Sequence, residues 1–240
     1  MSRGRGQGRG QRTSKPGGRR MSQRVKTAKG RKISSTRWLQ RQLNDPYVAE
    51  ARRVGYRSRA AFKLIELDDR FHFLAAGGRV VDLGAAPGGW TQVAVERTRA
   101  GHSGGGRVVS IDVTEFDPVA GAIVLHHDFL DAEAPTALRD ALAGTADVVL
   151  SDMAAPATGH AATDHLRVIG LVESALAFAA EVLAPGGTFV AKVLQGGTEQ
   201  VILAQIKRLF ATVKHAKPPS SRSGSAEMYV VAQGFRGTTK

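Results

Sequence analysis

From residue 78 onwards, short runs rich in valine and isoleucine alternate with longer segments whose apolar residues recur at helical spacing. The strand-like runs cover residues 78–83, 107–112, 123–127, 146–151, 187–193, 211–215 and 227–232. The helix-like segments cover residues 89–99, 134–143, 165–182 and 200–210. This alternation is typical of a parallel sheet with helical crossovers, so we expect a doubly wound, Rossmann-like α/β fold with a seven-stranded, mostly parallel sheet.

Only a polar turn, residues 217–225, separates the last two strand-like runs. Because a parallel connection needs a longer crossover, we expect the last strand to enter antiparallel, at the edge of the sheet. Ahead of the first strand, residues 58–73 carry a helical apolar stripe with Ser58 as the expected N-cap. Residues 35–56 predict shorter helices, which the turn signal Asn44-Asp45-Pro46 interrupts.

The basic residues are concentrated at the N-terminus. Residues 1–37 hold 13 of the 34 Lys and Arg and no acid, whereas the other 21 basic residues balance all 21 acidic ones. Since residues 1–34 are rich in Arg and Gly and nearly free of apolar side chains, we expect a disordered arm that binds a polyanion, RNA above all. A solubilising tail and an organellar transit peptide are the other interpretations, but residues 1–24 lack the apolar face that a transit peptide needs.

Several classes of protein are disfavoured by what the sequence lacks. Without cysteine there is no disulfide, no thiolate metal site and no cysteine nucleophile. The seven histidines form no ligand motif such as His-Glu-x-x-His, so no metal is expected. No run approaches the ~18 apolar residues of a membrane span and no apolar signal core is present, so we expect a cytoplasmic protein without membrane contact.

Residues 82–90, Asp-Leu-Gly-Ala-Ala-Pro-Gly-Gly-Trp, join the first strand to the helix that follows. Small residues let the backbone approach a ligand, which predicts a nucleotide-bearing cofactor, although such turns also serve as plain connections. The spacing is not G-x-G-x-x-G, which disfavours a nicotinamide cofactor. Asp112 ends the next strand, where a carboxylate binds ribose hydroxyls, and Asp128 follows the third, where it could accept from an adenine amino group. Either acid alone could equally cap a helix or close a turn.

Five motifs then occur in a fixed order. They are SRAAFKL at 58–64, DLGAAPGGW at 82–90, SDMA at 151–154, a Pro-Gly-Gly turn ahead of AKV at 191–193, and SAEMYVV at 225–231. With these motifs the chain resembles the FtsJ/RlmE family of ribose 2'-O-methyltransferases from about residue 36 to residue 237. The resemblance implies an S-adenosylmethionine-dependent methyltransferase domain over residues 35–237, which follows the arm.

The resemblance also implies the site residues. The family's catalytic tetrad falls on Lys63, Asp152, Lys192 and Glu227. S-adenosylmethionine would contact Gly88, Trp90, Asp112 and Asp128, with Asp152 close to its methyl group. One departure from the family follows SDMA, where Pro and then Asn are common and this chain has Ala155-Pro156-Ala157; the part that this loop plays in substrate placement is left open.

Two of the tetrad residues also stand out by their positions. Lys192 interrupts an apolar strand, where an ammonium group is costly to bury without partners. We therefore expect it to act chemically, to form a structural ion pair, or to extend its charged end to water from the end of the strand. Asp152 follows its strand at the edge where open α/β sheets bind ligands. A ribose hydroxyl is a poor nucleophile, so we expect Lys192, when uncharged, to remove its proton. Alternatively Lys192 only orients the hydroxyl; Glu227 would hold Lys192, and Lys63 would steady the tetrad or the RNA.

The expected substrate also follows from the resemblance. Bacterial members of the family methylate a uridine ribose in the A-loop of 23S rRNA in the large ribosomal subunit, and relatives that act on transfer RNA anticodon loops are the second possibility. A non-catalytic ribosome assembly factor and a small-molecule methyltransferase are further alternatives, and a monomer is expected. Side chains that could contact the RNA around the site are Arg37, Trp38, Arg41, Arg57, Arg59 and Arg222.

Overall fold

The computed structural model describes residues 33–156, 158–195 and 200–237. It divides into two compact units, residues 1–45 and residues 46–240. The described part of the first unit contains helix α1, Ile33–Leu43. The predicted arm, residues 1–34, lies almost wholly outside the described residues, as do the side chains of Arg37 and Trp38. The second unit holds everything else that is discussed below.

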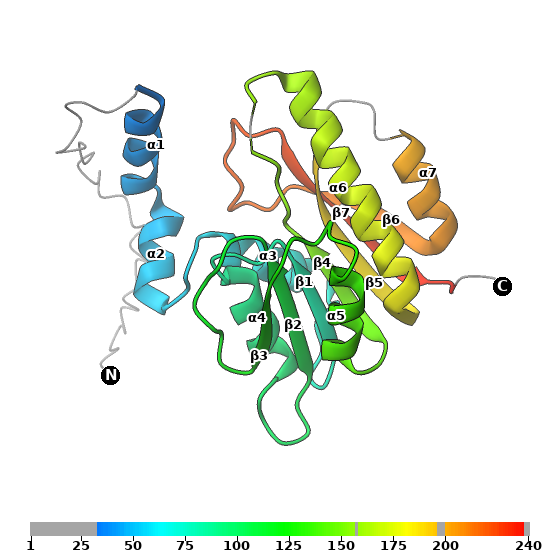
Figure 1. The fold of residues 1–240 in the computed structure, drawn as a ribbon. Coiled ribbons are helices and arrows are strands. Elements are labelled where there is room, and N and C mark those ends of the chain that lie inside the picture. Colours follow the sequence, from blue (N-terminus) through cyan, green and yellow to red (C-terminus); the bar gives the residue numbers. More distant parts are fainter. Residues whose placement is uncertain (1–32, 157, 196–199, 238–240) are drawn as a thin grey trace, which may run out of the picture. The chain divides into compact units, whose positions relative to one another are not determined.

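The second unit is built on one seven-stranded sheet with the order β3-β2-β1-β4-β5-β7-β6 (Figure 1). The strands are β1 Arg79–Leu83, β2 Arg107–Asp112, β3 Ala122–His126, β4 Ala146–Ser151, β5 Leu183–Leu194, β6 Phe210–Ala216 and β7 Glu227–Phe235. Strands β1 to β5 pair in parallel, whereas β7 is antiparallel to both β5 and β6. The doubly wound, mostly parallel sheet predicted from the sequence is therefore confirmed.

The antiparallel strand itself lies one place in from the edge. We predicted a single antiparallel strand at the edge, and β7 is that strand, but β6 continues the sheet beyond it. The reason is burial on both faces: Val230 and Val231 of β7 are both fully covered, whereas most side chains of β6 are exposed or half-buried. A strand that is apolar on both faces is stable inside a sheet, and a more polar strand suits the edge.

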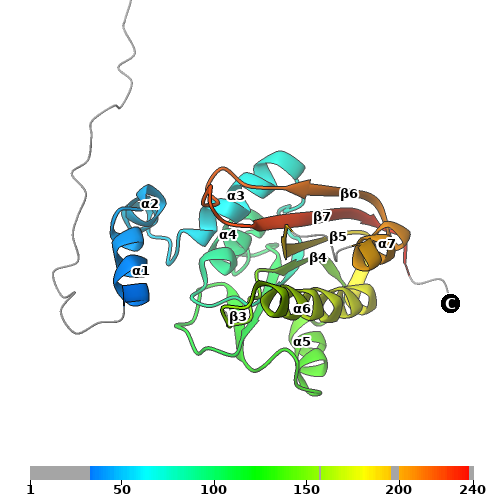
Figure 2. The ribbon, with the colours of Figure 1, turned by 90° about the horizontal axis from the view of Figure 1, so that it is seen from above.

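Helices cover both faces of the sheet (Figures 1 and 2). They are α3 Ala60–Phe71, α4 Gly89–Thr98, α5 Ala134–Leu142, α6 Ala161–Val182 and α7 Gln200–Leu209, whereas α2 Pro46–Val54 contacts α3. Leu64 and Leu67 of α3 pack with Trp90 of α4 against one face. The long helix α6 covers the other face with Val168, Val172, Ala175, Leu176 and Ala179, at the spacing of one helical stripe. Among the described residues, no helix is both long and apolar enough to cross a membrane.

The start of α3 differs from the prediction. The helix begins after Arg59, whose side chain makes no capping hydrogen bond, so Ser58 is not its N-cap. The Ser58 hydroxyl is instead buried without a hydrogen-bond partner. It packs against the start of α4, where a Cβ on Gly89 would collide with it. Close packing between the chain before α3 and the start of α4, rather than capping, therefore explains the small residue at this position.

Candidate active site

A large polar hollow lies where β1, β2 and β4 end, at the point where the strand order reverses. Its volume is about 490 Å³, and the residues that line it include Asp112, Asp128 and Asp152 as well as the loop 153–156. Open α/β sheets bind ligands at this kind of switch point, and pockets for small ligands typically measure about 300–1,000 Å³. Gly84 permits the two loops to meet, since its φ is +77° and a Cβ would lie 2.8 Å from the backbone of Met153.

Backbone amides hold two of these acids in place. Asp112 accepts hydrogen bonds from the amides of Ala86, at 2.9 Å, and Thr114, at 2.7 Å. Asp128 accepts from the amide of Leu130 at 2.9 Å. Each carboxylate oxygen has more than one lone pair, so these bonds leave capacity for a ligand. The turn-forming and ligand-binding interpretations of the two acids are therefore compatible.

The structure does not bring the other two predicted cofactor residues into the lining of this hollow. Gly88 lies in the loop before α4 with a φ of 103°. Trp90 is buried, and its indole N–H donates to the carbonyl of Ala60 at 2.8 Å. Its ring lies 5.5 Å from that of Tyr229. Trp90 therefore supports the floor of the site, and any ligand contact of these two residues remains a prediction.

The four predicted catalytic side chains meet beside this hollow. Lys192 on β5 lies 3.0 Å from Asp152 Oδ1 and also donates to the Asp152 carbonyl. Lys63 on α3 lies 2.7 Å from Glu227 Oε1 and donates to Oε2 at 2.9 Å. All four side chains are less than a fifth exposed. We had expected Glu227 to hold Lys192. It pairs with Lys63 instead, because the register sets Glu227 opposite Leu194.

Tyr229 joins the two ion pairs and was not predicted as a site residue. Its hydroxyl donates to Asp152 Oδ1 at 2.8 Å and accepts from Lys63 Nζ at 3.2 Å. Burial, with the nearby charges of Asp152 and Glu227, raises the pKa of Tyr229 well above its usual value, so the phenol stays protonated. The sequence signal is period-two spacing, because residues 227 and 229 of a strand lie on the same face.

Asp82 is a second site residue that the sequence prediction missed. It is fully buried at the end of β1, where Oδ2 accepts from the Thr91 hydroxyl at 2.7 Å and Oδ1 has no partner. Burial, with smaller contributions from the charges of Asp152 and Asp112, raises the pKa of Asp82 to about 7. An acid within an otherwise apolar strand was the available signal. Asp82 therefore carries a proton at the floor of the site below neutral pH.

Asp82→Asn should change how stability depends on pH. Between pH ~4 and ~7 the folded protein holds a proton that the unfolded chain has lost, so the free energy of unfolding falls as pH rises through this window and is level above it. A shift from 3.8 to about 7 corresponds to roughly 4 kcal/mol. Urea unfolding at pH 5 and pH 8 should show about 3 kcal/mol of this loss in the wild type, the part that falls above pH 5, and none in the variant. If the free energy of unfolding changed equally with pH in the wild type and in Asp82→Asn, the prediction would be contradicted. Asp140→Asn, at an exposed position, serves as the control.

Arg57 occupies a different place from the one expected. Its guanidinium donates to the carbonyls of Asp117, Pro118, at 2.7 Å, and Pro87, at 3.3 Å. It therefore holds together the loops after β1 and β2. Arg59 and Arg222 instead line a small hollow next to Lys63 and Glu227. Arg41 belongs to the other unit, and its position relative to the site is not determined.

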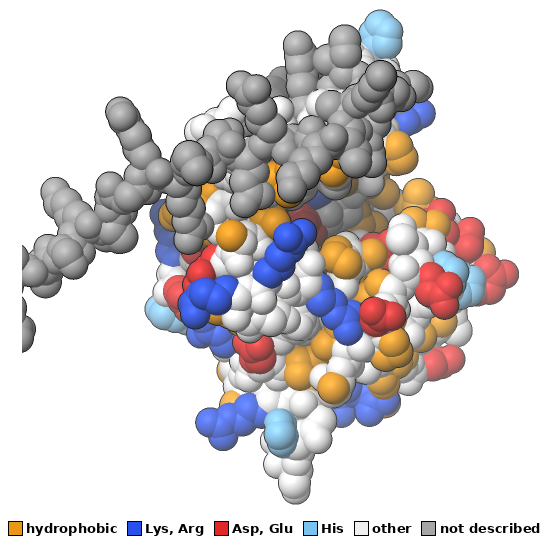
Figure 3. Space-filling model, turned by 90° about the vertical axis from the view of Figure 1, so that its left-hand side faces the viewer, with side chains coloured by type: hydrophobic (Ala, Val, Ile, Leu, Met, Phe, Trp, Pro, Cys, Tyr) orange, Lys and Arg blue, Asp and Glu red, His pale blue; other side chains and the backbone are white. Residues whose placement is uncertain are grey.

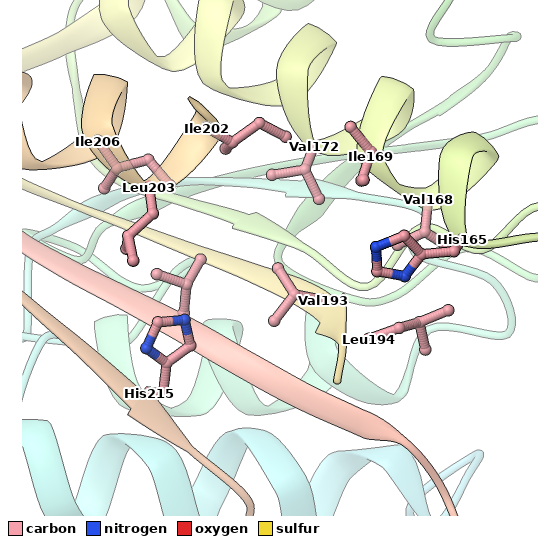
Figure 4. A pocket seen from close by; sticks show the side chains of 11 residues that line it. His165, Val168, Ile169, Val172, Val193, Leu194, Ile202, Leu203, Ile206 and His215 are labelled. Atoms are coloured by element: carbon pink, nitrogen blue, oxygen red, sulfur yellow. The ribbon is translucent and has the colours of Figure 1, made fainter. Parts of the chain in front are cut away.

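A second crevice, between α6, α7 and the sheet, has a different character (Figure 4). Valine, isoleucine and leucine side chains make up nearly all of its lining, and His165 and His215 are its polar members. It offers no converging carboxylates for a polar ligand. Among the described residues, no group of three or more His, Asp or Glu could hold a metal ion. The hollow at the ends of β1, β2 and β4 is thus the candidate site.

A Rossmann-like sheet with a polar pocket at its switch point is an architecture that α/β methyltransferases share with other nucleotide-binding proteins. A crystal structure described as a ribosomal RNA methyltransferase of Plasmodium falciparum aligns with a TM-score of 0.68 and 30% identity, covering 76% of this chain and 100% of that one. The family model of FtsJ-like methyltransferases matches residues 56–235. The chain belongs to the FtsJ-like methyltransferase family, as its motifs predicted.

Curated relatives match over nearly the whole chain. A protein of Paramagnetospirillum magneticum named ribosomal RNA large subunit methyltransferase E is 68% identical, over 93% of this chain and 92% of its own length. A protein of the same name from Rhodospirillum rubrum is 66% identical, over 92% of this chain and 84% of its own length.

Proposed function

We propose that the protein transfers the methyl group of S-adenosylmethionine to the 2'-hydroxyl of a uridine ribose in the A-loop of 23S rRNA, within the large ribosomal subunit. The observation that carries the proposal is the pair of lysine–carboxylate contacts joined through Tyr229 beside the cofactor-sized hollow. The names of the two relatives favour ribosomal RNA as the substrate. We assign catalysis to residues 35–237 and RNA binding to the basic arm, residues 1–34.

The donor set of the hollow fits S-adenosylmethionine. We assign Asp112 to the ribose hydroxyls and Asp128 to the adenine amino group, since both are anchored acceptors that line the hollow. Exposed Val113 and Leu130 line the same hollow and can cover the faces of an adenine ring. When bound, S-adenosylmethionine supplies an electrophilic methyl group. Asp152 lines the hollow and also contacts Lys192, so it would lie between that methyl group and the base.

The mechanism that we propose assigns one role to each side chain of the cluster. Lys192, in its uncharged form, accepts the proton of the ribose 2'-hydroxyl as that oxygen bonds to the methyl carbon and the carbon–sulfur bond breaks. Asp152 and Tyr229 orient Lys192, because Asp152 Oδ1 contacts both. Lys63 and Glu227 in turn hold Tyr229 from the other side. The alternative is that Lys192 only orients the hydroxyl and the proton leaves to water.

The proposal is tested by transfer of labelled methyl from S-adenosylmethionine to purified, unmethylated large ribosomal subunits, with bulk transfer RNA in parallel. We expect label at one ribose 2'-oxygen of the 23S rRNA, located by mapping the modified nucleotide. Label only in transfer RNA would keep the mechanism and refute the substrate. Cofactor binding without transfer to either RNA would refute the enzymatic proposal in favour of a non-catalytic assembly factor.

Asp112→Ala should weaken the binding of S-adenosylmethionine. The variant loses the proposed bonds to the ribose and frees the amides of Ala86 and Thr114, which shape the pocket. Hydrogen bonds to a charged group are worth about 1.5–3 kcal/mol, which corresponds to a roughly 10- to 100-fold higher dissociation constant. Isothermal titration calorimetry measures it, with exposed Asp140→Ala as the control. An unchanged dissociation constant would refute the ribose role.

A further inference from the structure

One residue of the turn between β6 and β7, Ser220, is hydrogen-bonded both to α3 and to Arg59, the residue before that helix. The amide and the hydroxyl of Ser220 both donate to Glu66 Oε2, at 2.8 and 2.6 Å. Arg59 donates to the carbonyl of the same residue. Ser220 is fully buried, so these bonds form away from water, where losing them is costly. Glu66 and Arg59 thus fix the position of the turn.

This fastening leads directly to the tetrad. The hydroxyl of Ser221, the next residue in the turn, donates to Glu227 Oε1 at 3.2 Å. Glu227 pairs with Lys63, which lies three residues before Glu66 and hence on the same side of α3. The contacts close a ring that runs from α3 through the turn to β7 and back to α3. The positions of the turn and of the Lys63–Glu227 pair are therefore coupled.

The turn and α3 enclose a small positive hollow. It measures about 110 Å³ and is lined by Arg59, Lys63, Arg222, Ser225 and Glu227, which bring three cationic groups and one carboxylate. On the face shown in Figure 3, the described Lys and Arg side chains lie among Asp and Glu. A hollow with an excess of positive charge and arginines in its wall suits an anion such as phosphate.

The hollow and the cofactor pocket lie on two sides of the tetrad. Lys63 and Glu227 line the positive hollow, whereas Asp152 lines the cofactor pocket, and the Tyr229 hydroxyl joins the two sides. A ribose placed over Lys192 and Tyr229 would therefore have the methyl donor on one side and the arginines on the other. In RNA the 2'-hydroxyl is on C2', and the 3'-phosphate is on the neighbouring carbon C3', so this phosphate is the one nearest to the reacting oxygen.

We propose that this hollow holds the phosphate on the 3' side of the target ribose, and that Glu66, acting through Ser220, is a positioning residue that holds its wall in place. The inference rests on the proposed function, since it needs an RNA ribose as the substrate. It assigns Arg222 and Arg59 to phosphate binding and gives the turn 217–226 a role in the reaction. A phosphate clamped here fixes the ribose so that its 2'-hydroxyl faces the methyl donor.

Arg222→Gln tests the phosphate contact. In methyl transfer to unmethylated large subunits, we expect KM for the subunit to rise about 10-fold and the slope of log(kcat/KM) against log salt to become shallower by about 1. The dissociation constant of S-adenosylmethionine should stay unchanged. Arg139→Gln removes the same charge from α5, on the other face of the sheet, and is the matched control. Unchanged KM and salt slope in Arg222→Gln, with an active wild type, would overturn the phosphate site alone.

Glu66→Ala tests the positioning role, with Glu66→Gln as its conservative partner. We expect the alanine variant to reproduce the rise in KM and to lower kcat about 10-fold, because both Ser220 and the Lys63–Glu227 pair lose support. Glutamine retains an acceptor for Ser220 and should restore most of both. Lower stability in urea with unchanged KM and kcat would make Glu66 merely structural and overturn the role. A wild type that binds the cofactor but transfers no methyl to subunits would overturn the proposed function itself.

Discussion

Lys192→Ala is expected to lower the rate of methyl transfer about 10³-fold while leaving the dissociation constant of S-adenosylmethionine nearly unchanged. A positioned general base typically contributes about 10²–10⁴-fold, and no other amine contacts Asp152 among the described residues. The lysine does not line the cofactor hollow, so binding should survive its loss. Single-turnover transfer to large ribosomal subunits measures the chemical step, and calorimetry measures cofactor binding.

The control for this prediction is Lys214→Ala. Lys214 is an exposed lysine on the neighbouring part of the sheet, in the edge strand β6, so its removal changes the net charge equally without reaching the site. Wild-type turnover in Lys192→Ala would refute the catalytic assignment. A variant that loses both cofactor binding and methyl transfer would also count against the assignment, because the defect would then lie in the cofactor pocket rather than in proton removal.

The sheet could be predicted from the sequence because its signals are local. Valine-rich runs such as 107–112 and 146–151 are buried strands in the structure, at the bounds that the sequence indicated. The place of β7 inside the sheet could not be obtained in this way. It depends on which of two neighbouring strands buries both faces against the helices, and this is settled by packing between segments that lie far apart in the sequence.

The sequence located four side chains that meet in the structure, but not the way in which they pair. Motifs located Lys63, Asp152, Lys192 and Glu227, and the structure brings them together. Which lysine meets which acid depends on the register between β5 and β7, and a shift of one residue would turn every side chain to the other face. The same register sets Tyr229 opposite Lys192. The spacing of residues 227 and 229 places them on one face of the strand, but it does not show which residues of β5 they meet.

Asp152→Ala should lower the rate of methyl transfer about as much as Lys192→Ala does, and it should also destabilise the fold. Asp152 Oδ1 is the acceptor for both Lys192 Nζ and the Tyr229 hydroxyl, and all three side chains are largely buried. Removing one partner of a buried ion pair costs about 3–5 kcal/mol, because it leaves an uncompensated charge. Urea unfolding of the variant and the wild type measures this loss. A stability within about 0.5 kcal/mol of wild type, the range of most surface substitutions, would contradict the prediction.

Asp152→Asn separates the two roles that Lys192 can have. The amide oxygen still accepts from Lys192 and Tyr229, so the fold should be retained, but the negative charge that favours the ammonium form is gone. If uncharged Lys192 removes the proton, the rising limb of the pH–rate profile should move to lower pH, with a reduced maximum. If Lys192 acts only as an ammonium that orients the hydroxyl, the variant should instead lose activity at a lower pH than the wild type, because the charge on Lys192 is lost earlier. Profiles of kcat between pH 6 and 10 therefore decide between proton transfer and orientation, because the two roles require opposite charge states of one side chain.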